Sequence, residues 1–211
     1  MEKFNNEEYL KFLNEWKTER KYEPFCEDGI LDVEKWEKSS RIMFLLKETY
    51  LDSGFYKIHN CGPCGPDNKR FWENMRMYTY ILDEFSQGKQ PILEEALKIR
   101  FEPNDSVAYV NIKKNVQNNK ESNNSDISEF ARQDKLYLLR QIELISPKII
   151  FCSGTFGNIN IIFDNVTSIS HNLSKANGIL LLGYYHLSDY GIGFEEEFHD
   201  VVKIVGDYYK E

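Results

Sequence analysis

The chain has 211 residues, of which 41% are hydrophobic and 14% aromatic, enough for one domain with a sizeable core. It contains no run near the ~18 apolar residues of a membrane span, and its acidic start, MEKFNNEEYL, lacks the pattern of a secretory signal, so we expect a soluble, cytoplasmic protein that does not bind membranes. The net charge of −8 argues against broad, non-specific attraction to nucleic acid, although a local basic strip can coexist with an acidic remainder.

The first half of the chain predicts two helices and a strand. Residues 5–20 have helical spacing of apolar side chains and belong to an expected N-terminal helical extension over 1–40. The short apolar run 41–46 is flanked by charge and predicts a buried strand. Glycines and prolines predict a loop over 54–67, and a helix is expected over 69–86.

The middle of the chain predicts a second strand, a loop and a helix. Residues 106–112 form the strand, and the polar, asparagine-rich segment KKNVQNNKESNNS that follows predicts a mobile surface loop. Asp126 and Glu129 resemble a capping box, and Pro147 ends the helix that they begin.

The last third predicts two more strands and a closing helix. The apolar runs 148–153 and 178–184 are the strands, with Thr155 onward turning into a helix between them. Apolar side chains from Phe194 to Tyr208 share one face of the closing helix.

Strands that alternate with helices predict crossover connections and a parallel sheet, and fully apolar strands suit a sheet covered on both faces. We therefore expect a single domain over 1–211, a three-layer α/β/α sandwich around a central four-stranded, mainly parallel sheet. Sites in such sheets form beyond the carboxyl ends of the strands. The residues at those ends include Glu48, Asn111, Gly154 and His186.

The four cysteines include one close pair, Cys61 and Cys64. A cytosolic chain is not expected to form disulfides, and a closed zinc or iron–sulfur site needs four ligands, often from two such pairs. We therefore expect ordinary thiols, with no metal and no cofactor; a redox pair stays open. No phosphate-binding loop or dinucleotide fingerprint is present.

Several of these segments resemble the motifs of the uracil-DNA glycosylase superfamily. Residues 46–50, LKETY, stand where its best-known branch has Gly-Gln-Asp-Pro-Tyr, and residues 186–188, HLS, resemble its His-Pro-Ser. Residues 110–111 resemble the strand that ends in a base-reading Asn, and 142–154 looks like the family's helix, Pro-Lys, strand and Gly. The resemblance covers roughly residues 41–210 and implies a uracil-DNA glycosylase-like fold.

The resemblance implies roles for five residues. Glu48 would activate water and stabilise the positive charge on the sugar, and His186 would stabilise the departing base. Asn111 would read the base, while Tyr50 or Phe55 would stack on it once the nucleotide is flipped out of the helix. Without that context, Glu48 and His186 are interpreted as a solvated strand-end carboxylate and a structural histidine, and Asn111 as a turn former.

A second set of residues is expected to contact DNA. These are Lys47, Lys113, Lys114, Ser153, Thr155, Leu187, Ser188 and Tyr190. Among them, Lys47 is interpreted either as a phosphate contact or as the partner that keeps Glu48 ionised. Leu187 and Tyr190 are candidate wedges that fill the space left by the flipped base.

The function implied is a DNA glycosylase that removes uracil or another modified base, with DNA containing such a base as partner. The Glu in place of Asp and Leu187 in place of Pro leave the base open, so DNA repair and defence against a phage with hypermodified bases both fit. The net charge and the Glu keep two alternatives open: a non-catalytic nucleotide- or protein-binding member of the fold, and a nucleoside hydrolase. Strandedness of the DNA and oligomeric state are not predicted.

Overall fold

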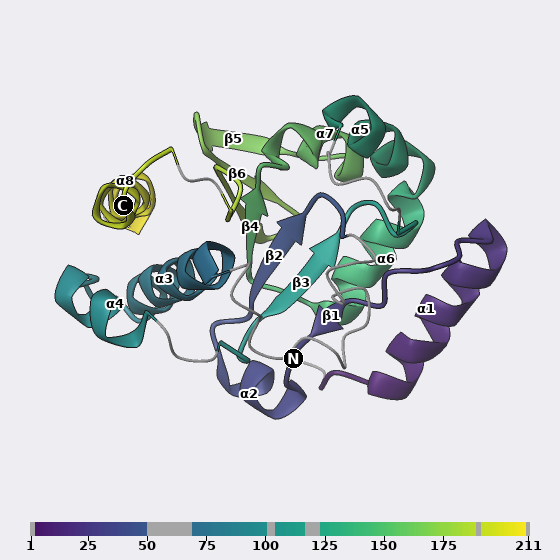
Figure 1. Ribbon diagram of the computed structural model, residues 1–211, viewed down its shortest axis with the longest axis horizontal. Helices are drawn as coiled ribbons and strands as arrows, with labels where there is room; N and C mark the ends of the chain where they lie inside the picture. Colours follow the sequence, from purple (N-terminus) through teal and green to yellow (C-terminus); the bar gives the residue numbers. More distant parts are fainter. Residues whose placement is uncertain (1–2, 50–68, 101–103, 117–122, 189–190, 210–211) are drawn as a thin grey trace.

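A mixed β-sheet forms the centre of the structure. The computed structural model describes residues 3–49, 69–100, 104–116, 123–188 and 191–209. In that part of the chain seven strands lie in the spatial order β1-β3-β2-β4-β7-β6-β5 (Figure 1). The strands are β1 (Gly29–Ile30), β2 (Ile42–Leu46), β3 (Ala108–Asn111), β4 (Ile149–Ser153), β5 (Thr167–Ser170), β6 (Leu173–Ala176) and β7 (Ile179–Tyr184).

The four central strands are the four that the apolar runs predict. β3, β2, β4 and β7 are mutually parallel neighbours. The expected sheet was nevertheless too small, because β1 pairs antiparallel with β3 and the β5–β6 hairpin extends the other edge antiparallel to β7. β1 has two residues and β5 is exposed along its length, so neither strand has the long apolar run that marks a buried strand.

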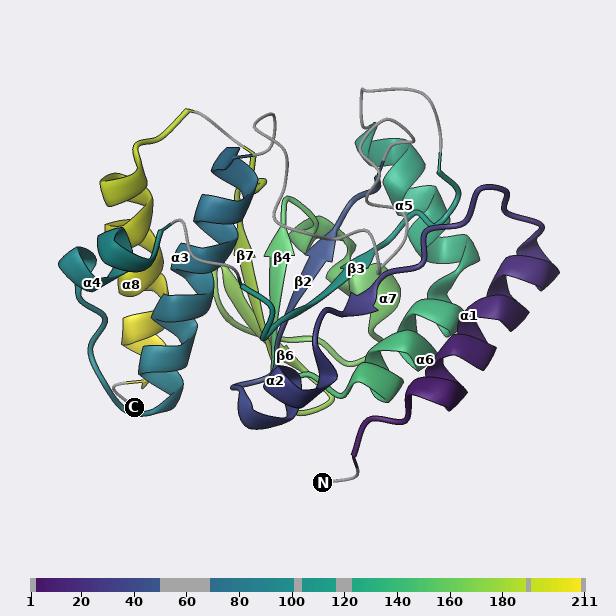
Figure 2. The same cartoon turned by 60° about the horizontal axis from the view of Figure 1, so that its bottom comes forward.

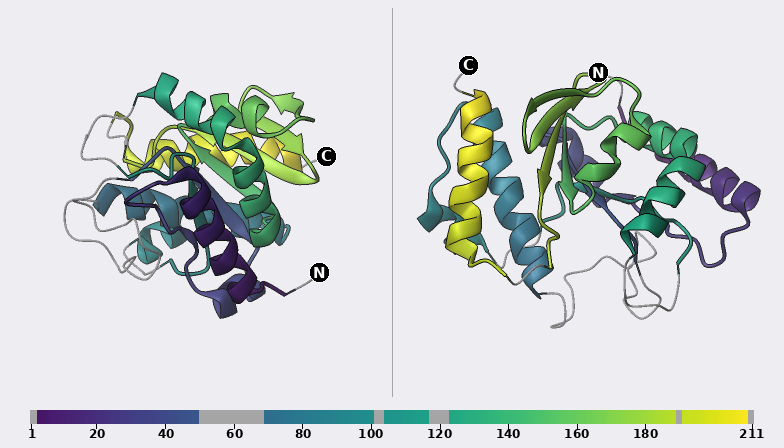
Figure 3. Two further views of the ribbon diagram at one scale, coloured as in Figure 1. Left: turned by 90° about the vertical axis from the view of Figure 1, so that its right-hand side faces the viewer. Right: turned by 90° about the horizontal axis from the view of Figure 1, so that it is seen from above.

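Helices cover both faces of the sheet and make three layers (Figures 1 and 3). α3, α4 and α8 pack on one face, and α1, α5, α6 and α7 on the other. The α-helices in the described residues are α1 (Asn6–Arg20), α2 (Val33–Lys38), α3 (Lys69–Ser86), α4 (Leu93–Ile99), α5 (Asn124–Gln133), α6 (Lys135–Ile145), α7 (Ile159–Ile162) and α8 (Phe194–Tyr209).

Successive residues of the central strands supply two separate cores. Met43 and Leu45 of β2 face α1 and α6, whereas Phe44 faces α3 and α8. On that second face the Tyr78 ring of α3 stacks on Phe151 of β4, with ring centroids 4.5 Å apart. This explains why the central strands are apolar on both sides: neither face meets water.

The N-terminal segment is part of the core as well as helical. Trp16 of α1 is fully buried and stacks on Tyr137 of α6, with centroids 5.1 Å apart. Trp36 of α2 is also buried, and β1 joins the sheet. The expected helical extension over 1–40 therefore contributes a strand and large aromatic side chains to one layer of the sandwich.

Two expectations for the middle of the chain were wrong. The helix expected from Asp126 is two helices, α5 and α6, which meet at Asp134. The buried Asp134 carboxylate pairs with Arg20 of α1 at 2.7 Å, which favours a break there over a continuous helix. The loop expected after β3 begins with two buried lysines, Lys113 and Lys114, so its start is not a surface loop. Residues 54–67 and 117–122 lie outside the described residues.

The connections reverse direction between β2 and β4. From β2 the chain continues through α3 and α4 to β3 on one side, whereas from β4 it continues through α7 and the β5–β6 hairpin to β7 on the other side. Figure 2 shows these strands side by side with their carboxyl ends at the upper edge of the sheet. Ligands of open α/β sheets bind beyond the carboxyl ends at such a switch point. In this protein that position is where Lys47, Glu48 and Gly154 lie.

Candidate active site

Gly154 allows the ends of three parallel strands to approach one another. Its φ of +64° lies in the left-handed region, and a Cβ there would lie 3.3 Å from Cε of Lys47 and 3.6 Å from Cβ of His186. Its backbone N–H donates to the carbonyl of Tyr184 at 3.0 Å. Lys47 and His186, expected at one site, therefore lie on either side of Gly154.

Glu48 pairs with Lys113 instead of Lys47. The Lys113 ammonium lies 3.1 Å from Oε2 of Glu48, whose side chain is only 4% exposed, and 2.5 Å from Oδ2 of Asp126 on α5. It also lies 5.1 Å from the centre of the Phe130 ring. Burial opposes the charge on Lys113, but its hydrogen bonds to Asp126 and Glu48 outweigh that effect and raise the lysine's pKa. Lys113 is thus committed to two carboxylates and is not available to a phosphate in this arrangement.

His186 has a defined tautomer. Its Nδ1 accepts a hydrogen bond from the backbone N–H of Ser188 at 3.2 Å. Because an accepting Nδ1 carries no proton, the neutral imidazole carries its proton on Nε2, which acts as a donor. The hydroxyl of Ser153 accepts from the N–H of Leu187 at 2.9 Å, and Asn74 donates to the Leu187 carbonyl at 2.9 Å. The backbone after β7 is therefore held from two sides.

Three residues expected to touch DNA have internal roles. Ser153, Thr155 and Leu187 are fully buried. Ser153 holds the backbone next to His186, Thr155 donates from its hydroxyl to the Leu45 carbonyl at 2.8 Å, and Leu187 packs in the core beneath α3 and α8. With no exposed surface, these side chains cannot contact phosphates or wedge into a base stack in this arrangement.

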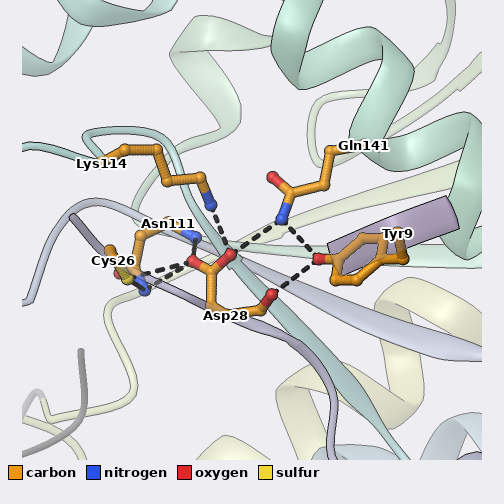
Figure 4. A network of polar contacts seen from close by, with 6 residues as sticks. All are labelled: Tyr9, Cys26, Asp28, Asn111, Lys114 and Gln141. Atoms are coloured by element: carbon orange, nitrogen blue, oxygen red, sulfur yellow. Dashed lines mark hydrogen bonds and ion pairs between the residues drawn. The ribbon is translucent and has the colours of Figure 1, made fainter. Parts of the chain in front are cut away.

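Lys114 and Asn111 belong to a buried cluster around Asp28, shown in Figure 4. Lys114 forms an ion pair with Asp28, and both side chains are completely buried. The Asn111 backbone N–H donates to Oδ2 of Asp28 at 2.6 Å, and its side-chain amide donates to the same oxygen at 3.1 Å and to Sγ of Cys26 at 3.5 Å. Lys114 is therefore a core residue, not a phosphate contact.

The same cluster ties the N-terminal segment to α6. Tyr9 donates to the Asp28 carbonyl at 2.6 Å, while Gln141 donates to Oδ1 of Asp28 at 2.9 Å and to the Tyr9 hydroxyl at 2.6 Å. The Asn111 amide nitrogen is used within the cluster, and its side-chain oxygen is buried without a hydrogen-bond partner among the described residues, so Asn111 does not face a ligand in this arrangement. Asp28 was missed by sequence reasoning, because a single Asp before Gly29 has no distinguishing pattern.

Some expected residues are not tested by the geometry. Tyr50, Phe55 and Tyr190 lie outside the described residues, as do Cys61 and Cys64. Within the described ranges no three His, Cys, Asp or Glu side chains gather as a metal site would require, and no helix is long and apolar enough to span a membrane. Lys47 and Ser188 are partly exposed, so they remain candidates for contact with a ligand.

No protein-family model matches the chain, and no curated protein matches it. The fold itself defines a layered α/β protein with a mixed sheet. Beyond the carboxyl ends of its parallel strands lie a carboxylate, Glu48 after β2, and an imidazole, His186 after β7.

Proposed function

We propose that this protein is a DNA glycosylase that hydrolyses the N-glycosidic bond of uracil or another modified base. The observation that carries the proposal is that a carboxylate and an imidazole both follow parallel strands at one edge of the sheet, Glu48 after β2 and His186 after β7. Glu48 is a nearly buried carboxylate with a lysine counterion, and His186 has its proton on Nε2. The resemblance of the segments around both residues to the uracil-DNA glycosylase superfamily supports the same function, and with it a fold of that kind.

The two groups fit the charges that develop when a base leaves. Positive charge builds on the sugar, and an ionised carboxylate such as Glu48 stabilises it and aligns a water for attack. Negative charge builds on the base, and the Nε2–H of His186 can donate to a base oxygen that receives it. Lys113 keeps the Glu48 carboxylate oriented through a 3.1 Å ion pair.

Fewer residues are proposed to contact DNA than the sequence predicts, because several of the predicted contacts are buried. Lys47 and Ser188 are the predicted contacts that keep exposed surface among the described residues. Few phosphate contacts in an acidic protein imply weak non-specific binding and a shallow dependence of affinity on salt. Recognition then depends on the flipped base more than on the DNA backbone.

The test is release of a base from oligonucleotides that carry uracil, hypoxanthine, xanthine or hydroxymethyluracil, detected by cleavage at the abasic site. We expect activity on at least one base and a fall of about 100-fold or more in Glu48→Gln and in His186→Asn. Glu129→Gln and His199→Asn change exposed residues of α5 and α8 and serve as matched controls. Equal, background-level release by the parent and Glu48→Gln on every base would refute the proposal, and cleavage of free nucleosides alone would indicate a nucleoside hydrolase.

A further inference from the structure

A cavity of about 740 Å³ begins one residue before His186, between α8 and the strands β5 to β7. Four aromatic side chains line it: Phe156, Tyr184, Tyr185 and Tyr208. Polar side chains of α8, among them Asp200 and Lys203, line the other wall. Ligand sites are commonly cavities of roughly 300–1,000 Å³ with aromatic walls and a few polar groups. The size and lining of this cavity therefore suit a flat organic ring with polar edges.

The aromatic walls are held in place, with one ring open to solvent. Tyr185 is 54% exposed, and its ring meets that of Tyr184 edge-on, with centroids 5.0 Å apart. Phe156 lies against the bare backbone of Gly183, where any Cβ would collide with its ring. Because more than half of Tyr185 is exposed, its ring offers surface on which another ring can stack.

The α8 wall supplies a fixed hydrogen-bond acceptor. The Tyr184 hydroxyl donates to Oδ2 of Asp200 at 3.1 Å, which orients this carboxylate. A carboxylate offers about four lone-pair sites, so Asp200 can accept further hydrogen bonds. Carboxylates of this kind accept from the exocyclic amino groups of nucleobases such as cytosine. Thymine and uracil have no such amino group.

We propose that this cavity binds an unpaired nucleobase with an exocyclic amino group, contributed by the nucleotide next to the one whose base enters the candidate active site. The base stacks on Tyr185 and donates to Asp200, and Lys203 lies exposed on the same wall near the backbone of that nucleotide. The position of this nucleotide rests on the proposed function. Tyr185 immediately precedes His186, and consecutive Cα atoms are about 3.8 Å apart, so this cavity begins next to the candidate active site.

The cavity makes single-stranded DNA the expected substrate. A base that enters it must leave its stack and its pairing partner, which costs a few kcal/mol in a duplex and far less in a single strand. Stacking on an aromatic side chain tolerates any base, whereas the Asp200 carboxylate distinguishes amino-bearing bases from the others.

The experiment measures binding without relying on base release. Fluorescence anisotropy is recorded with labelled single strands of dC, dA or dT, each of about 12 nucleotides, and with a matched duplex. We expect single strands to bind more tightly than the duplex, and dC and dA more tightly than dT. Tyr185→Ala weakens binding about tenfold or more, and Tyr185→Phe stays within about twofold of the parent. Tyr209→Ala, an exposed tyrosine of α8 that does not line this cavity, leaves binding unchanged.

Asp200→Ala tests the selectivity separately. Removal of a negative charge strengthens all DNA binding, so the readout is the ratio of the dC and dT affinities, which we expect to fall toward one. The inference is overturned if the parent does not bind single strands, if the duplex binds equally well, if Tyr185→Ala binds as the parent does or if dC and dT bind alike. Tyr185-dependent binding without release of any base would overturn the glycosylase proposal and leave the nucleobase site standing.

Discussion

Lys113 and Lys114 are neighbours in the chain but form ion pairs in two different environments. Lys113 lies at the carboxyl edge of the sheet between Glu48 and Asp126, and the Asp126 side chain is 42% exposed. Lys114 lies in the core against Asp28, and neither side chain reaches solvent. The edge pair orients a candidate catalytic carboxylate, whereas the core pair joins the N-terminal segment to β3. Two lysines adjacent in the chain thus have different environments, one at the edge of the sheet and one in the core.

The two environments differ in how much they depend on each partner. A charge buried without a partner costs several kcal/mol, because neither water nor protein compensates it. Asp28 meets this requirement with Lys114, Gln141 and both N–H donors of Asn111. The Asp126 carboxylate is exposed to water, so water can replace Lys113 as its hydrogen-bond partner. We therefore expect the core cluster to dominate stability and the edge pair to dominate activity.

The largest effect is expected from Lys114→Met. The substitution leaves the Asp28 carboxylate buried without a counterion and lowers the free energy of unfolding by about 3–5 kcal/mol, as measured by urea denaturation. The double variant Asp28→Asn, Lys114→Met removes both charges but keeps a side-chain oxygen that can accept from Asn111 and Gln141, so it recovers part of that loss. A loss below about 1 kcal/mol in Lys114→Met would contradict the role of this ion pair.

Lys113→Met is expected to affect activity as well as stability. Glu48 loses its orienting partner, so base release falls by about tenfold or more. Stability falls by about 2–3 kcal/mol because Glu48 is nearly buried, which is less than in Lys114→Met because Asp126, the other partner of Lys113, is exposed to water. Lys135→Met, which breaks the surface pair with Asp164, is the matched control and changes neither property appreciably. If Lys113→Met destabilised the protein as much as Lys114→Met, the distinction between the two environments would be lost.

Ser153→Ala is expected to have a smaller effect. The Leu187 N–H loses its acceptor, which lowers stability by about 1–2 kcal/mol and lets the backbone at His186 shift, so base release falls severalfold. Thr155→Val removes a comparable buried hydrogen bond, to Leu45, and should cost similar stability with activity retained. Activity that changes equally in both variants would mean that Ser153 has no positioning role.

The smallest effect concerns Cys26 in the core cluster. Burial, and then the charge of Asp28, raise the pKa of this thiol well above its ordinary value. The native thiol therefore keeps a proton that the unfolded chain loses above about pH 8.5, so this stabilisation is present at lower pH and is lost as pH rises. The loss is about 0.7 kcal/mol between about pH 8 and pH 9 and should be absent in Cys26→Ala. Urea midpoints of both proteins measure it.

The reactivity of Cys26 gives a second check. The thiolate is the form that alkylating agents attack, so Cys26 should react slowly with iodoacetamide at neutral pH until the protein unfolds. Peptide mapping by mass spectrometry identifies the modified cysteine. Rapid alkylation in the native state would show that the cluster opens readily.

Much of the fold follows from local patterns. The four apolar runs predict β2, β3, β4 and β7, because strands covered on both faces have no polar side. β1, β5 and β6 are short or partly exposed, so their pairing depends on neighbours distant in the sequence. The break at Asp134 was missed for the same reason, since Arg20, which pairs with it, belongs to α1.

The sequence by itself determined that a carboxylate, an amide and an imidazole follow parallel strands, since parallel strands bring their carboxyl ends to one edge. It did not determine which of them face a ligand. Asn111 and Lys114 turn into the core because they bind the buried Asp28 carboxylate there. Lys113, and not Lys47 as expected, pairs with Glu48. The partners come from segments far apart in the chain, and only tertiary packing brings a buried charge to the group that neutralises it.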